Sequence, residues 1–215
     1  MLDKLLQIIG EKHPLKEIPA GEMGKMKISG MTFTVRAYDA QGLGHVSAMQ
    51  ASGFFGLMKM DTLVINPFRK DLPLYSYDRI LAMGNDTLIV EVYDTLSGDV
   101  DLSALAKAKA DCADVADYDP GQHWYDPMML HESIHKKGKK IHTPKLNTLT
   151  ETYLRSYLAL EAGEGDPSVK KAKTCAYVEG LLENGGPSTD VFKKKLGADA
   201  TARFFREIFF GTQRM

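Results

Sequence analysis

The stretch Asn66-Pro-Phe-Arg-Lys-Asp-Leu-Pro-Leu-Tyr-Ser-Tyr-Asp78 lies between runs of residues that favour β-strands. Residues 57–65 precede it, and residues 79–83 and 86–94 follow it with a turn of only two residues between them. Connections this short cannot hold a crossover helix, so we expect these strands to be antiparallel. Asp78 then lies in a sheet with at least one covered face. A carboxylic acid is unfavourable there unless it is hydrogen-bonded or carries a proton.

The rest of the chain divides into strands followed by helices. Apolar and polar residues alternate along 31–37, as in a half-buried strand, and similar runs predict a sheet over about 25–95. Helical spacing of apolar residues predicts a helix at 1–10, and further helices at about 100–112 and within 146–211. This order favours an α+β fold, in which helices pack on the faces of one antiparallel meander sheet. No long linker interrupts the chain, so we expect a single domain over residues 1–215.

Composition excludes several classes of function. The chain of 215 residues has a net charge of -1, which gives no general attraction to nucleic acid. No apolar run approaches the roughly 20 residues that span a bilayer, and the N-terminus lacks a secretory pattern. Cys112 and Cys175 have no metal-ligand spacing, and Gly-rich nucleotide loops are absent. We therefore expect a cytoplasmic protein that binds neither nucleic acid nor membrane.

A zinc-hydrolase pattern occurs at His131-Glu132-Ser-Ile-His135. On a helix, two histidines at this spacing bind metal, and the glutamate between them acts as base. The segment lies in an irregular region, about 114–145, and is followed by the solvated run Lys136-Lys-Gly-Lys-Lys140. Ile141 occupies the place of a third histidine ligand. The context favours a polar loop or edge strand, and a zinc hydrolase through His131, Glu132 and His135 remains an alternative.

The segment Asp71-Leu-Pro-Leu-Tyr-Ser-Tyr-Asp78 resembles the "DLP…(G)xD" segment of the ferredoxin-dependent bilin reductases. The C-terminal residues 191–210 are similar to the last pair of helices in that family. The resemblance implies an α/β/α sandwich that holds a linear tetrapyrrole between the sheet and the C-terminal helices. It also implies that Asp78 donates a proton to the ligand.

The resemblance extends to other positions of the site, with departures. Thr62 stands where some members have a histidine, and Gln50 stands near the position of a glutamate. Asn184 is the nearest match to a helical Asn-Asp pair of the family. Asp94 ends the strand that follows the Asp71–Asp78 segment, as an aspartate does in the family. Positive side chains are expected to pair with the two propionates of a bilin. The candidate ligand-binding residues are Gln50, Thr62, Arg36, Arg69, Asp94 and Asn184, with Lys59 as a further propionate partner.

The function that this resemblance implies is reduction of a bilin. Electrons come from ferredoxin or a similar donor, and no bound metal or flavin is needed. The lysines of 193–195 or 136–140 would dock the acidic electron-transfer protein. Because Gln50 and Thr62 replace two acid–base groups, a non-catalytic protein that binds a tetrapyrrole or another small molecule on the same fold is the alternative.

Overall fold

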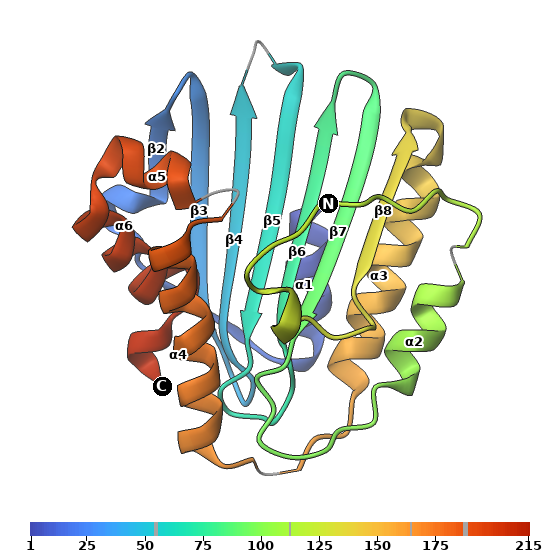
Figure 1. The fold of residues 1–215 in the computed structure, drawn as a ribbon, viewed down its shortest axis with the longest axis vertical. Helices are drawn as coiled ribbons and strands as arrows, with labels where there is room; N and C mark the ends of the chain where they lie inside the picture. Colours follow the sequence, from blue (N-terminus) through green and yellow to red (C-terminus); the bar gives the residue numbers. More distant parts are fainter. Residues whose placement is uncertain (54–55, 112, 164, 187–188) are drawn as a thin grey trace.

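The computed structural model describes residues 1–53, 56–111, 113–163, 165–186 and 189–215, and Figure 1 shows their arrangement. One sheet of eight strands forms the centre, in the order β1-β3-β4-β5-β6-β7-β8, and β2 also pairs with β3. All pairings are antiparallel. The strands are β1 (Leu15–Ile18), β2 (Lys25–Ile28), β3 (Met31–Ala40), β4 (Gly44–Gly53), β5 (Met58–Asn66), β6 (Leu74–Ala82), β7 (Asn85–Tyr93) and β8 (Ile134–Lys139).

Helices cover both faces of this sheet, which confirms the predicted three-layer α+β sandwich. One apolar core joins one face of the sheet to α1, α2 and α3, and a second joins the other face to the C-terminal helices. Within the described residues, no helix is long and apolar enough to cross a membrane. The helices are α1 (Leu2–Lys12), α2 (Ser103–Ala110), α3 (Thr143–Ala159), α4 (Pro167–Asn184), α5 (Thr189–Leu196) and α6 (Ala198–Arg203), and a π-helical turn (Phe204–Phe209) follows α6.

Tight turns produce the meander. Met83 and Gly84 connect β6 to β7, and both have positive φ, at 51° and 74°. A two-residue turn with two positive φ angles matches the twist of antiparallel strands, and the second position favours glycine. Side chains alternate along β6, so Tyr75 and Tyr77 enter the core beneath α3, while Asp78 points to the opposite face.

The sheet is larger than predicted at both edges. β1 begins at Leu15, ahead of the expected start near residue 25, and β8 lies in the segment predicted to be irregular. The inward positions of β8 are Ile134, Lys136 and Gly138, so hydrophobic alternation is missing. Lys136 is nevertheless buried, because its ammonium group donates a hydrogen bond to the carbonyl oxygen of Val115, at 2.9 Å. Because a lysine stands at an inward position, the alternation of apolar and polar residues did not predict this strand.

Candidate functional site

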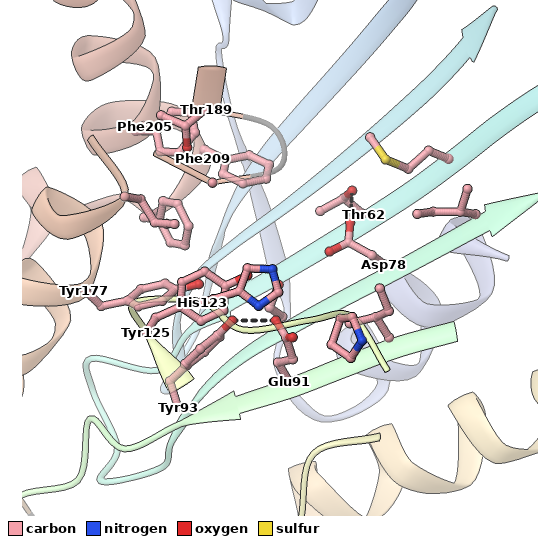
Figure 2. Close-up of a pocket in the computed structure, with 18 of the residues that line it drawn as sticks. Thr62, Asp78, Glu91, Tyr93, His123, Tyr125, Tyr177, Thr189, Phe205 and Phe209 are labelled. Atoms are coloured by element: carbon pink, nitrogen blue, oxygen red, sulfur yellow. Dashed lines mark hydrogen bonds between the residues drawn. The ribbon is translucent and has the colours of Figure 1, made fainter. Parts of the chain in front are cut away.

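A cavity of about 230 Å³ lies between β5, β6 and β7 and the C-terminal helices. Its sheet side includes Thr62, Asp78, Glu91 and Tyr93. Aromatic side chains from the segment before β8, from α4 and from the π-helical turn complete the lining, and Figure 2 shows them around the two carboxylates. The cavity therefore combines a polar floor with aromatic walls.

Asp78 is fixed at this floor by its neighbour on β5. Thr62 and Asp78 are direct partners in the register of β5 and β6. The Thr62 hydroxyl donates a hydrogen bond of 2.5 Å to the Asp78 carboxylate. Burial raises the pKa of Asp78 to about 6, the Thr62 hydrogen bond opposes this rise, and the negative charge of Glu91 adds to it. Asp78 can therefore exchange a proton near neutral pH, as a general acid requires.

Glu91 is a second buried carboxylate on this floor, and it is not among the residues predicted from the sequence. Tyr93 donates a hydrogen bond of 2.5 Å to one of its oxygens, and His135 Nε2 lies 3.0 Å from the other. The available signal was the strand itself. Residues 88–93 are apolar at both alternating sets of positions except at Glu91, and a lone charge in a strand covered on both faces needs partners.

The aromatic walls come from segments far apart in the chain. The rings of Tyr93 and Tyr177 have centroids 4.2 Å apart, and Tyr125 packs edge-on against both. The His123 imidazole stacks on Tyr125 with an interplanar angle of 5°. Burial raises the pKa of Tyr93 and of Tyr177 well above the usual value, so both remain neutral phenols. Flat neutral surfaces of this kind suit a conjugated apolar ligand.

Two predicted ligand-binding residues lie on the opposite face of the sheet. Gln50 is exposed on β4 and donates a hydrogen bond of 3.3 Å to Asp61, its partner in the register. Arg36 on β3 pairs with Asp3 of α1 at 2.7 Å. The side-chain alternation of β3 and β4 places both away from the cavity, so the prediction that they bind the ligand is wrong for this cavity.

The remaining predicted ligand-binding residues also lie outside the cavity lining. Arg69 is exposed in the loop after β5 and pairs with Asp39 at 2.7 Å. Asp94 accepts hydrogen bonds of 3.1 Å from the Leu96 amide and from Lys173, so it stabilises the turn after β7. Asn184 is exposed as the last residue of α4, and Lys59 is exposed on β5. Of the predicted ligand residues, only Thr62 contributes to the cavity.

The zinc-hydrolase alternative is not supported by the local structure. His131 and Glu132 lie in a turn, and His135 lies in β8, so the two imidazoles are not one helical turn apart. Among the described residues, no cluster of three or more His, Cys, Asp and Glu side chains is arranged to hold a metal ion. The segment is a turn followed by an edge strand, in line with the favoured interpretation, and of the two histidines only His135 lies on the strand. His135 instead bonds Glu91.

The fold matches solved structures, whereas the comparisons by sequence found no match. The match includes the crystal structure of phytochromobilin synthase from tomato in complex with biliverdin, with a TM-score of 0.77 at 12% sequence identity. The alignment covers 99% of this chain and 82% of that one. No family model and no curated protein matches this sequence. At this identity the likeness establishes a shared fold.

Proposed function

We propose that this protein binds a linear tetrapyrrole and reduces it with electrons from a ferredoxin-type donor. One observation carries the proposal: Asp78, with its pKa raised to about 6, faces an aromatic cavity between the sheet and the C-terminal helices. A protein of the same fold has been crystallised with biliverdin. The resemblance of Asp71–Asp78 to the bilin reductases is a separate line of support.

The cavity suits part of such a ligand. An apolar cavity of about 150 Å³ holds one benzene molecule, so about 230 Å³ accommodates one or two pyrrole rings. The other rings would extend past His123 and Tyr125, or displace the segment that carries them. Among the described residues that line the cavity, none is Lys or Arg. The propionates would therefore point out of the cavity, toward solvent.

Asp78 supplies the acid that the reaction needs. Reduction of one carbon–carbon double bond consumes two electrons and two protons. A one-electron donor first forms a radical anion, whose basicity is higher than that of the oxidised ligand. The protonated Asp78 transfers its proton to this anion and becomes a carboxylate, which the Thr62 hydroxyl stabilises by its hydrogen bond. A second electron and a second proton complete the reduction.

Binding and turnover are tested separately. Purified protein is titrated with biliverdin, and the visible spectrum is followed together with the fluorescence of Trp124, the only tryptophan in the chain. Trp124 packs against Tyr125 and Tyr177 of the cavity wall, so a bound bilin should quench its fluorescence. Reduced ferredoxin is then added without oxygen, and loss of the biliverdin absorbance is recorded.

Asp78→Asn is the diagnostic variant, and Asp61→Asn is its matched control on the neighbouring strand. Asp61 points to the opposite face and bonds Gln50. We expect Asp78→Asn to bind biliverdin and to reduce it about 100-fold more slowly or worse, while Asp61→Asn behaves as wild type. If wild type shows neither a spectral shift nor quenching, the tetrapyrrole proposal is wrong.

A non-catalytic binding protein is the second candidate. Thr62, the hydrogen-bond partner of Asp78, has a hydroxyl that does not titrate in the physiological range, which leaves Asp78 without a titratable partner at that position. A spectral shift without turnover in wild type, across several one-electron donors, would select this candidate.

A further inference from the structure

Glu91 lies one diagonal step from Asp78 on the cavity floor. Asp78 pairs directly with Ile89, and Glu91 is two residues farther along β7, so it faces the same side of the sheet. Diagonal neighbours of this kind are about 7–8 Å apart, within reach of one bound ring system. The floor therefore presents two carboxyl groups to a single ligand (Figure 2).

His135 connects Glu91 to the surface of the protein. It lies on β8 at the edge of the sheet, opposite Ile89 in the register, and its side chain is 16% exposed. Its Nε2 atom lies 3.0 Å from Glu91 Oε1. Because a carboxylate oxygen only accepts, this nitrogen carries the hydrogen. Solvent, His135, Glu91 and the cavity thus form one continuous path for protons.

The proposed reaction needs a second proton, and this path could supply it. Each reduced double bond takes two protons, and Asp78 holds one. Thr62, which bonds Asp78, is a poor acid and cannot reload it during the reaction. Other titratable groups face the cavity as well: His123, Tyr93, Tyr118, Tyr125 and Tyr177. His123 lies 3.6 Å from Asp126 and stacks on Tyr125, so its imidazole is held within the aromatic wall.

We propose that Glu91 donates the second proton of the reaction and that His135 reloads it from solvent. This inference rests on the proposed function and adds a catalytic residue and a positioning residue to it. After the first electron and the Asp78 proton have been taken up, the substrate is a neutral radical and Asp78 is a carboxylate. His135 takes a proton from solvent on its other ring nitrogen and passes the Nε2 proton to Glu91 along their hydrogen bond. Glu91 transfers this proton to the substrate carbon as the second electron arrives from the external donor, so two electrons and two protons are consumed in all.

The test uses Glu91→Gln in the full chain, with biliverdin and a photoreduced ferredoxin in the absence of oxygen. Glutamine keeps the shape of the side chain and one acceptor for the Tyr93 hydroxyl, but it has no proton to donate. We expect unchanged biliverdin binding, an organic radical that accumulates at least 10-fold above wild type by electron paramagnetic resonance, and product formation slower by about 100-fold. Asp61→Asn serves as the matched control, and thermal unfolding verifies that each variant is folded.

The two histidines of the same motif provide a second comparison. His135→Ala should slow product formation at high pH, where proton supply is limiting, and added imidazole should restore it. His131→Gln, at the exposed histidine in the turn before β8, should leave the rate unchanged. If His135 were needed only for packing, free imidazole would not restore the rate of His135→Ala in proportion to the fraction of imidazole that is protonated.

Separate results overturn the inference and the proposed function. If Glu91→Gln forms product within threefold of wild type and without extra radical, Glu91 is not the second donor. The same result combined with a slow His123→Gln variant would assign the second proton to His123. If wild type neither binds nor reduces biliverdin, the proposed function fails, and the inference fails with it.

Discussion

Replacing Asp78 with asparagine should stabilise the protein at neutral pH. In the unfolded chain the carboxyl ionises near its ordinary pKa of 3.8, whereas burial in the folded protein raises the pKa to about 6. Between these values the folded state keeps a proton that the unfolded state has lost. The free energy of unfolding of wild type therefore falls as pH rises through this window. Asparagine does not ionise, so the variant avoids this loss.

The magnitude follows from the two pKa values. A change from 3.8 to about 6, at about 1.36 kcal/mol per pKa unit, corresponds to about 3 kcal/mol. The variant should therefore gain about 3 kcal/mol over wild type between pH 4 and pH 7.5. The Thr62 hydroxyl keeps an acceptor, because the asparagine side-chain oxygen replaces the carboxylate oxygen.

Urea unfolding at several pH values, followed by circular dichroism, measures this difference. With a slope of roughly 3 kcal/mol per molar urea, the midpoint of Asp78→Asn should lie about 1 M above that of wild type at pH 7.5. At pH 4 the two midpoints should be closer by that amount. A difference between the proteins that is constant across the pH range would refute the argument that burial makes ionised Asp78 unfavourable.

Three further predictions test neighbouring features. Thr62→Val removes the hydrogen bond that lowers the pKa of Asp78, so the Asp78 titration followed by carbon-13 NMR should shift to higher pH. His45 bonds the Ile208 carbonyl at 2.8 Å, and burial lowers its pKa to about 4. Between pH 6.5 and 4 the unfolded state binds the extra proton, so wild type should lose about 3 kcal/mol relative to His45→Gln in urea unfolding at pH 4 compared with pH 7. Gly180→Ala should destabilise the protein although alanine favours helices by about 1 kcal/mol, because the new methyl group overlaps the Trp124 ring; a lowered melting temperature with a red-shifted Trp124 emission checks this.

The sequence predicts the strands best where the alternation of apolar and polar residues agrees with the residue types of the turns. A two-residue turn joins β6 to β7 and residues 67–73 join β5 to β6, and both connections are too short for a crossover helix, so an antiparallel meander was predictable. The pairing of Asp78 with Thr62 was implied by the family resemblance, and the register of β5 and β6 has it. To predict the face on which a residue lies, one must also know which residues of its strand point to each side of the sheet. Arg36 and Gln50 are polar strand residues near Asp78 in the predicted sheet, yet the alternation of β3 and β4 directs them to the face covered by α1 and α3.

Long-range pairing determines the remainder of the site. Tyr125 and Tyr177 are 52 residues apart in the sequence, and their contact depends on α4 returning across the sheet. No local period encodes such a contact. Glu91 was detectable as a charge in an apolar strand, but its partner was not, because β8 lacks the alternation that would identify it as the neighbouring strand.

The His131–His135 motif shows that the secondary structure of a segment determines whether its histidines can bind one metal ion. On a helix, residues four apart are separated by about 6 Å along the axis and share one face, which suits two ligands of one metal ion. In this chain His131 lies in a turn and His135 lies on β8, so the two imidazoles do not share one face of a helix. A strand residue instead finds its partner across the ladder. His135 faces Ile89 in the register, and the diagonal position beside it on the same face is Glu91, 3.0 Å from the imidazole. Because His135 lies on β8, it does not bind metal with His131 but forms a hydrogen-bonded pair with Glu91 at the edge of the cavity.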